Sequence, residues 1–487
     1  MTIRRHPGAV NRDPAARKIP SVTVVGGGLA GCEAAWALAE RGVPVVLREM
    51  RPLVPTPAHQ TDRLAELVCS NSFKSTELTN AHGLLKAELR RLGSLLLHAA
   101  DEARVPAGAA LAVDRSIFSG LVHEQVGGHP RITVERAEAT DLPSPGVVAT
   151  GPLTSPALAD AIIARIGSRP EAAVAASCAG GRWQAVAEPP SRRAAEHTAL
   201  AFYDAIAPIV SRDSLDLSRI YACSRYGKGE GDDYLNCPLS REQYEGFIAA
   251  LASADQYTAH EFDQVPYFEG CLPIEEMARR GPETPRFGPM KPVGLPDPST
   301  GREPWAVVQL RREDRAGRMW NMVGFQTRLR VPEQKRVFGL VPGLQQAEFL
   351  RYGSIHRNTY INSPACLGPA LTAQDDDMLF FAGQLTGVEG YAESLGTGVL
   401  AGINLARRLA GSEPRVPPST TMLGGLYRYL RDADPERFQP MNANFGLLDE
   451  LDGSAARRLG GSKGKAARKE LFVERAQQDF GAWLRTL

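Results

Sequence analysis

Cysteine is scarce in this chain of 487 residues, and the few cysteines follow no paired pattern. There are seven, an odd number, and no two are spaced as Cys-x-x-Cys. The odd, scattered set excludes a disulfide framework, and the lack of close pairs disfavours a structural zinc site. The sequence therefore predicts reduced thiols, a cytoplasmic location and no metal centre.

Excess charge of one sign and long hydrophobic runs are also absent. The chain carries 56 Lys and Arg against 55 Asp and Glu, which excludes a generally basic nucleic-acid coat but not a local basic patch. The longest uncharged run, residues 142–159, contains four prolines and predicts a loop and a strand instead of a membrane helix. Residues 1–19 lack the apolar segment of a secretory signal and are expected to form a flexible tail.

A strand, a glycine-rich turn and a helix follow one another near the start of the chain. Residues 21–25 are Ser-Val-Thr-Val-Val, residues 26–31 are Gly-Gly-Gly-Leu-Ala-Gly, and residues 32–41 are typical of a helix. A second strand ends at an acidic residue about 20 positions after the turn. Such glycines let a pyrophosphate approach the helix N-terminus, and the carboxylate accepts from a ribose hydroxyl. The order favours a dinucleotide site, over a purely structural turn, at Gly26, Gly27, Gly28, Leu29, Ala30, Gly31 and Glu49.

A second glycine-rich turn lies far along the chain. Residues 378–383 predict a strand that ends at Gly383, and a helix is expected over residues 397–410. Between them lie Gly387, Glu389 and Tyr391, which are candidates to face a flavin. Taken alone, these features are equally compatible with a buried strand and a tight loop. Together with the first turn they favour FAD, and the lack of a second complete GxGxxG motif argues against a dedicated nicotinamide domain.

The middle of the chain breaks the alternation of strands and helices. We therefore predict an α/β fold in which a Rossmann-like FAD-binding domain is split by an inserted α+β domain. The expected parts are a tail at 1–19, the FAD-binding domain at 20–189 and 336–450, the inserted domain at 190–335, and a basic tail at 451–487. Two interpretations of the basic tail stay open, a contact with RNA phosphates and a merely solvated segment.

Two cysteines lie in polar surroundings. Cys237 ends a glycine-rich stretch that contains Arg225 and Lys228, so a loop thiol with a lowered pKa could act there as a nucleophile. Cys69 lies where an apolar stretch meets a polar turn, with Lys74 close by. For both residues the alternative, an inert packed thiol, stays open on the local sequence alone.

Many strings along the chain occur in the order found in a known family. The sequence from about residue 20 to residue 410 resembles the bacterial folate- and FAD-dependent tRNA (uracil-5-)-methyltransferases. Besides the first glycine-rich turn, the strings lie at residues 49–52, 66–72, 80–86, 106–115, 149–155, 202–205, 224–226, 234–238, 288–295, 323–327, 351–353, 356–360 and 381–391.

The resemblance implies a reaction and its cofactors. Members of the family move the one-carbon unit of 5,10-methylenetetrahydrofolate to carbon 5 of uridine 54 in the T loop of tRNA. Reduced FAD supplies the electrons, and NADH or NADPH re-reduces it. Carbon 5 of uracil is a poor nucleophile, and a thiolate that adds to carbon 6 activates it. By the family match that thiolate is Cys237, and Cys69 is a second functional cysteine close to the flavin. The target base must leave its stack to react.

Several further residues are candidates for contacts with the substrates. Those expected to contact tRNA phosphate or the folate glutamate are Lys291, Arg225, Lys228 and Arg357. Arg328 stands where many relatives have His, which leaves folate stacking at that position in question, and Cys223 is not counted as catalytic.

Three other functions compete with the methyltransferase. One is an FAD-dependent tRNA wobble-uridine modification protein, which begins with a similar turn but has a longer chain and a GTPase partner. The others are a non-catalytic FAD- and RNA-binding or adhesion protein and a generic NAD(P)H oxidase. The methyltransferase is favoured because of the Asn-Cys-Pro string at 236–238. For it, no membrane and no obligatory protein partner are expected.

Overall fold

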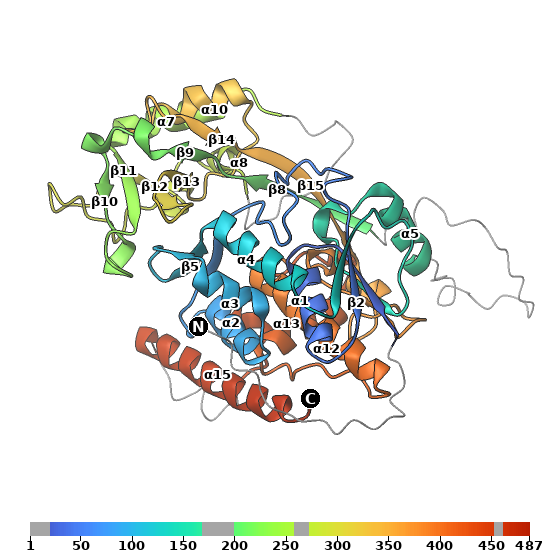
Figure 1. Cartoon of the computed structure of the whole chain (residues 1–487). Helices are drawn as coiled ribbons and strands as arrows, with labels where there is room; N and C mark the ends of the chain where they lie inside the picture. Colours follow the sequence, from blue (N-terminus) through green and yellow to red (C-terminus); the bar gives the residue numbers. More distant parts are fainter. Residues whose placement is uncertain (1–19, 168–198, 258–271, 452–460) are drawn as a thin grey trace, which may run out of the picture.

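The computed structural model describes residues 20–167, 199–257, 272–451 and 461–487. Two sheets organise them, each with its own hydrophobic core (Figure 1). We call the part around the parallel sheet the first unit and the part around the larger antiparallel sheet the second unit. The expected tail at 1–19 lies outside the described residues. Within the described residues, no helix is long and apolar enough to cross a membrane.

The first unit is built on a five-stranded sheet whose paired strands are all parallel. Its order is β16-β7-β1-β2-β6, so a strand from late in the chain lies at one edge. The alternation of β-branched strands with helices predicts this arrangement, and the Rossmann-like fold is confirmed. The strands are β1 (Val22–Val25), β2 (Val45–Glu49), β6 (Ile132–Arg136), β7 (Gly146–Val148) and β16 (Leu379–Phe381).

Two helices from opposite ends of the sequence pack closely in the first unit. They are α1 (Leu29–Ala39) and α12 (Tyr391–Leu409), and small residues face one another between them. A Cβ atom on Gly398 would collide with the carbonyl oxygen of Ala30, and one on Gly402 would lie 2.5 Å from that of Ala34. The sequence predicts a helix over residues 397–410, whereas α12 begins at Tyr391, six residues before the expected start.

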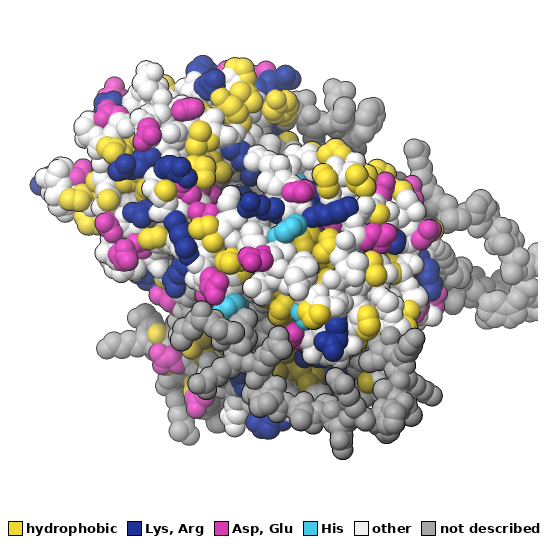
Figure 2. Space-filling model, viewed as in Figure 1, with side chains coloured by type: hydrophobic (Ala, Val, Ile, Leu, Met, Phe, Trp, Pro, Cys, Tyr) yellow, Lys and Arg dark blue, Asp and Glu magenta, His cyan; other side chains and the backbone are white. Residues whose placement is uncertain are grey.

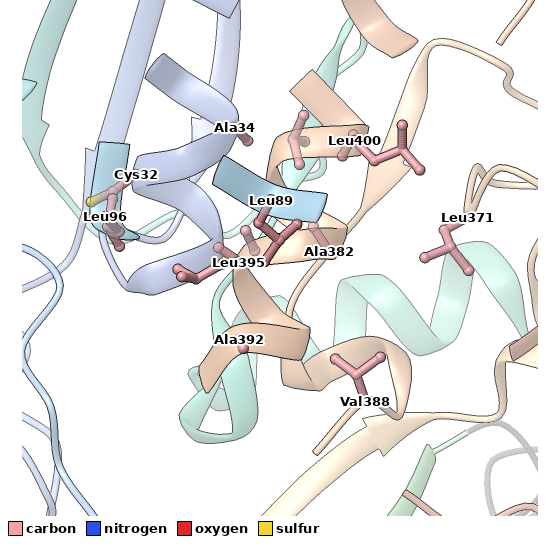
Figure 3. Close-up of a cluster of buried hydrophobic side chains, with 14 of the residues drawn as sticks. Cys32, Ala34, Leu89, Leu96, Leu371, Ala382, Val388, Ala392, Leu395 and Leu400 are labelled. Atoms are coloured by element: carbon pink, nitrogen blue, oxygen red, sulfur yellow. The ribbon is translucent and has the colours of Figure 1, made fainter. Parts of the chain in front are cut away.

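The remaining elements of the first unit complete its core. Figure 3 shows Ala34 of α1, Leu89 of α2 and Leu395 of α12 within this core. The other helices are α2 (Ala81–Arg91), α3 (Leu95–Glu102), α4 (Arg115–Gly127), α5 (Pro156–Ile166), α11 (Ser363–Cys366) and α13 (Met422–Asp432). A small antiparallel sheet, in the order β3-β5-β4, contains β3 (Ser72–Ser75), β4 (Arg104–Val105) and β5 (Ala110–Val113).

The second unit is a six-stranded antiparallel sheet in the order β10-β11-β12-β13-β9-β14. Its strands are β9 (Ile209–Ser211), β10 (Tyr221–Ala222), β11 (Tyr234–Leu239), β12 (Ala306–Arg312), β13 (Met319–Met322) and β14 (Phe349–Arg351). Its helices are α7 (Arg241–Ser253), α8 (Ile274–Arg280), α9 (Thr284–Phe287) and α10 (Val331–Phe338). Phe247 of α7 and Phe338 of α10 both pack in its core. The expected boundary at 335 is therefore placed too early, because it falls inside α10 and before β14.

A long antiparallel ribbon connects the two units. It pairs β8 (Ala199–Ile206) with β15 (Ser354–Ile361) along their whole length (Figure 1). The chain leaves the first unit through one strand of the ribbon and returns through the other. This topology explains why the sequence shows one fold interrupted by another.

The C-terminal segment differs from the expected basic tail. Residues Gly461–Leu484 form helix α15, and Phe472, Ala476 and Phe480 on it are buried in the core of the first unit. The guanidinium of Arg91 on α2 lies 5.5 Å from the centre of the Phe480 ring. This apolar face is difficult to recognise in the sequence, because basic residues lie between the apolar ones and the two kinds separate only when the segment forms a helix.

Charges of both signs are mixed on one face of the molecule. On the face shown in Figure 2, Lys and Arg side chains are interspersed with Asp and Glu.

Candidate active site and cofactor cleft

A cleft lies at the carboxyl end of the parallel sheet, between β1, β2 and the residues after β7. Gly26, Gly28, Glu49, Thr150 and Leu153 are among its lining residues. Ligands of open α/β sheets bind in this position, outside the carboxyl ends of the strands. The cleft is therefore where the sequence motif places a dinucleotide.

The glycines of the first turn permit close packing beneath the cleft. Gly26 has a φ of +103°, and a Cβ atom there would lie 2.6 Å from the carbonyl oxygen of Ala149. A Cβ atom on Gly27 would lie 2.8 Å from the Glu49 carboxylate, and one on Gly31 would collide with the backbone of Gly26. Any side chain at these three positions would push the turn away from the sheet.

Gly28 differs from the other glycines of this turn because the space beside it is open. A Cβ atom built on it has no neighbour within 4 Å, and Gly28 is the N-cap of α1 without a side-chain capping bond. Leu29 and Ala30 form the first turn of the same helix. The N–H groups of this turn are thus available to an anion in the cleft.

Glu49 lines the cleft, but protein donors already contact both of its carboxylate oxygens. Oε2 accepts from the N–H of Gly27 at 2.8 Å, and Oε1 accepts from the N–H and the Nε–H of Arg51 at 2.9 Å each. Burial opposes ionisation, yet the hydrogen bonds and the charge of Arg51 outweigh it, so the pKa of Glu49 is lowered. Oε2 accepts only one of these hydrogen bonds and keeps a second lone pair for a ribose hydroxyl, whereas the two bonds from Arg51 use both lone pairs of Oε1.

A second pocket adjoins the first, and Leu153 lines both. Cys69, Asn358, Gln384, Glu389 and Tyr391 also line this second pocket. The structure thus brings Cys69 together with two of the residues predicted from the late glycine-rich turn. Asn358 and Gln384 were not predicted as site residues, although both lie within the family strings at 356–360 and 381–391.

Backbone contacts hold Cys69 firmly at the edge of this pocket. Its N–H donates to the Tyr391 hydroxyl at 3.1 Å, and its carbonyl accepts from Arg115 at 3.2 Å. The Tyr391 hydroxyl also donates to the carbonyl of Ser70 at 2.8 Å. Burial raises the pKa of Tyr391, and the nearby Cys69 adds to the rise, so the hydroxyl keeps the proton that it donates.

Arg115 was missed by the sequence reasoning, although it ends one of the family strings. Its guanidinium bonds Glu313 of the second unit at 2.6 Å and the carbonyl of Leu67 at 2.6 Å. Burial opposes its charge, but Glu313 outweighs burial and raises the pKa of Arg115. Arg115 therefore remains a cation beside the Cys69 backbone.

The late glycines shape the turn before α12. Gly383 and Gly387 have φ values of +78° and +86°. A Cβ atom on Gly383 would lie 2.9 Å from that of Ala30, and one on Gly387 would lie 2.5 Å from the Phe438 ring. Glu389 accepts from Gln384 at 2.5 Å within the second pocket. Glu389 and Tyr391 thus line the pocket, whereas contacts within the protein account for the two glycines.

Cys237 lies in a different environment from the one its local sequence indicates. It is in the middle of β11, opposite Val308 of β12, and is 0% exposed in the core of the second unit. Burial raises the pKa of its thiol. Of the two environments left open by the sequence, the loop thiol with a lowered pKa is wrong and the packed thiol is correct, because strand pairing places the side chain among apolar residues. The catalytic role itself stays a prediction.

Three of the four predicted cations come together at the edge of the second unit. Arg225 donates to the carbonyl of Lys291 at 2.8 Å, and Lys228 pairs with Glu77 of the first unit at 2.5 Å. The side chain of Arg357 lies outside the described residues. Arg328 donates to Gln256 at 2.8 Å and is held next to Glu275 and Glu276.

Comparison with known proteins places the chain in a family. The family model described as "Glucose inhibited division protein A" matches residues 21–413. A "Methylenetetrahydrofolate--tRNA-(uracil-5-)-methyltransferase TrmFO" of Geobacter sulfurreducens is 53% identical over 469 residues, which cover 96% of this chain and 99% of the relative. The chain belongs to the TrmFO family. The resemblance seen in the sequence is thereby confirmed.

Other relatives separate TrmFO from the wider group. A protein of the same name from a strain of Thermus thermophilus is 51% identical over 95% of this chain and 96% of its own. The solved structure of Aquifex aeolicus GidA superposes with a TM-score of 0.64 over 95% of this chain and 73% of that one, at 16% identity. The GidA likeness shows the shared fold alone, whereas the identity to TrmFO proteins extends over almost the whole chain.

Proposed function

We propose that this chain transfers the one-carbon unit of 5,10-methylenetetrahydrofolate to carbon 5 of uracil in tRNA, with FAD as its resident cofactor. The observation that carries the proposal is the 53% identity to a TrmFO protein over 96% of this chain. The two adjoining pockets support it, because they offer a site for a dinucleotide next to a site with a cysteine.

The residues of the first cleft fit FAD. The open space beside Gly28 and the uncapped N-terminus of α1 suit its pyrophosphate, and Glu49 suits its ribose. The connection through Leu153 leads from there to the Cys69 pocket, which suits the flavin end. When bound, FAD supplies the electrons that reduce the transferred carbon to a methyl group.

We assign to Tyr391 and Arg115 the task of fixing the Cys69 segment. Both hold its backbone through hydrogen bonds, so the thiol keeps a defined position at the pocket. A fixed position favours proton transfer to or from a bound substrate. Cys69 is therefore proposed for acid–base or protecting work at the flavin.

Cys237 is proposed as the thiolate that adds to carbon 6 of uracil. That addition makes carbon 5 nucleophilic. After the one-carbon unit is attached, carbon 5 loses its proton, the double bond between carbons 5 and 6 forms again, and the thiolate leaves carbon 6. Because Cys237 is 0% exposed, the role requires the face of β11 that carries it to open when tRNA binds. The family match supports this assignment. Because Cys237 is buried, opening the strand to expose it must cost free energy.

The finer features of the reaction are also part of the proposal. They are the target at uridine 54 of the T loop, re-reduction of FAD by NADH or NADPH, a cytoplasmic location and the absence of an obligatory protein partner. They come from the family resemblance and from the reduced thiols expected of the sequence.

The test uses the purified holoprotein, an unmodified tRNA transcript, 5,10-methylenetetrahydrofolate and NADH. The RNA is digested and 5-methyluridine is measured by mass spectrometry. We expect product only when the folate is present. NADH consumption without any need for folate or tRNA would instead indicate an oxidase, and FAD binding without either reaction would favour the wobble-uridine or non-catalytic alternatives.

Cysteine variants separate the roles within the same assay. Cys237→Ala and Cys69→Ala are expected to retain FAD and to lose methylation by at least about 100-fold, the usual scale for removing a catalytic group. Cys223→Ala is the matched control, because Cys223 is a nearby thiol that is not assigned to catalysis. Full methylation by Cys237→Ala would contradict the nucleophile assignment.

A further inference from the structure

Tyr226 has a backbone conformation that a bulky residue rarely adopts. Its φ and ψ are 59° and 27°, in the left-handed region. The residue is also 65% exposed, so burial does not compensate for the strain. Strained residues that persist on a surface are concentrated at functional sites.

The surrounding segments hold the Tyr226 ring in place. Its N–H donates to the carbonyl of Gly294 at 3.0 Å. A Cβ atom on Gly294 would lie 2.5 Å from the ring, so the ring rests directly against that glycine. Arg225 ties the same two segments together by donating to the carbonyls of Lys291 and Val293. The aromatic ring is thus both exposed and anchored.

Cationic residues lie in the same two segments as this ring, which follow β10 at the edge of the second sheet: Lys228 is two residues after Tyr226, and the carbonyl of Lys291 accepts from Arg225. Lys228 and Lys291 are exposed, and Arg225 is half-buried. The loop also touches the first unit, because Lys228 pairs with Glu77 and Asp233 accepts from the N–H of Gly108 at 2.5 Å. A ligand on this surface would therefore contact both units at once.

We propose that Tyr226 is a stacking platform for an unpaired base of tRNA, with Lys228 and Lys291 beside it to contact phosphates. The inference rests on the proposed function, which makes tRNA the substrate. A single-stranded nucleic acid is recognised by an anchored aromatic face next to cations, because every base has a face that stacks and every linkage carries a negative charge. The backbone holds the ring in position before the RNA binds, so the ring loses little conformational entropy on binding.

The test measures the affinity of the holoprotein for a fluorescently labelled tRNA transcript by anisotropy. Tyr226→Asn removes the ring but keeps a residue that tolerates the left-handed conformation, so the loop is not disturbed. We expect its Kd for tRNA to rise about 10-fold, the usual scale for losing a base–aromatic stack. Tyr226→Phe keeps the ring and is expected to bind within about twofold of the wild type.

Tyr257→Asn is the matched control. Tyr257 is also an exposed tyrosine, at 45%. The guanidinium of Arg330 lies over its ring, 5.2 Å from the ring centre, and occupies a face on which a base would stack. Its removal is expected to leave the Kd for tRNA unchanged. Circular dichroism and FAD content confirm that all variants are folded.

Two results would overturn the inference. One is an unchanged Kd and KM for tRNA in Tyr226→Asn, and the other is a rise only in the KM for the folate. A wild-type protein that binds tRNA through Tyr226 but forms no 5-methyluridine would refute the proposed function and support the platform. A wild-type protein that does not bind tRNA would refute both.

Discussion

The two cysteines proposed for catalysis lie in opposite environments. Cys69 is partly exposed at the second pocket, and hydrogen bonds to its backbone fix its position. Cys237 is 0% exposed in an apolar core, where burial raises the pKa of its thiol. Because the thiolate is the reactive form, accessibility and charge together determine which thiol reacts first in the free protein.

Alkylation of the native protein tests this difference. With iodoacetamide at pH 8, Cys69 is expected to be labelled at least about 10-fold faster than Cys237, since only the thiolate reacts and burial disfavours it. Peptide mass spectrometry over time gives both rates. Cys32 is an internal reference, because burial also raises the pKa of its thiol. Equal labelling of Cys69 and Cys237 would show that β11 opens readily without tRNA.

Glycines determine how closely the helices of the first unit approach. Gly398 on α12 lies directly against the backbone of Ala30, in the first turn of α1. Gly246 on α7 is also helical, but the space beside it is empty to at least 4 Å. The same residue type therefore serves packing at one position and has no packing role at the other.

The same substitution at both glycines is expected to have opposite effects. Gly246→Ala should raise the free energy of unfolding by up to about 1 kcal/mol, because alanine favours the helix. Gly398→Ala should lower it by about 1–3 kcal/mol, because the added methyl group forces α12 away from α1. Urea unfolding measures both changes. Loss of FAD from Gly398→Ala is also expected, and a stabilised Gly398→Ala would refute the close packing.

At the scale of the whole molecule, the Cys69 segment lies where the two units meet. The side chain of Asn71, just after it, accepts from Arg311 of β12 at 2.9 Å. Arg115 of α4 bonds Cys69 on one side and Glu313 of the second unit on the other. Movement of one unit relative to the other would thus act directly on the pocket.

The Arg115–Glu313 pair gives a test of this joint. The Glu313 side chain is 1% exposed, so Arg115→Gln leaves a buried charge without its partner. The free energy of unfolding is expected to fall by about 3–5 kcal/mol. The double variant with Glu313→Gln should recover part of that loss, which urea unfolding measures.

An exposed ion pair supplies the control for the joint. Arg90 and Asp101 are paired at 2.9 Å with side chains 39% and 43% exposed. Arg90→Gln is expected to cost less than about 1 kcal/mol, because solvent screens the pair. Glu313→Gln is measured as a single variant as well. If the losses of unfolding free energy in the two single variants add up to the loss in the double variant, the two side chains do not act together.

Sequence alone determined the features that depend on neighbouring residues. The strand, the glycine turn, α1 and Glu49 lie within one short stretch, so their spacing alone predicts the cleft. The alternation of strands and helices and its break in the middle of the chain likewise indicated the Rossmann-like fold and its interruption by a second unit. The environment of each cysteine was decided only by the tertiary structure, because pairs such as Cys69 with Tyr391 and Cys237 with Val308 are distant in the chain. Burial and hydrogen bonding depend on such distant contacts, and these form only when the chain folds.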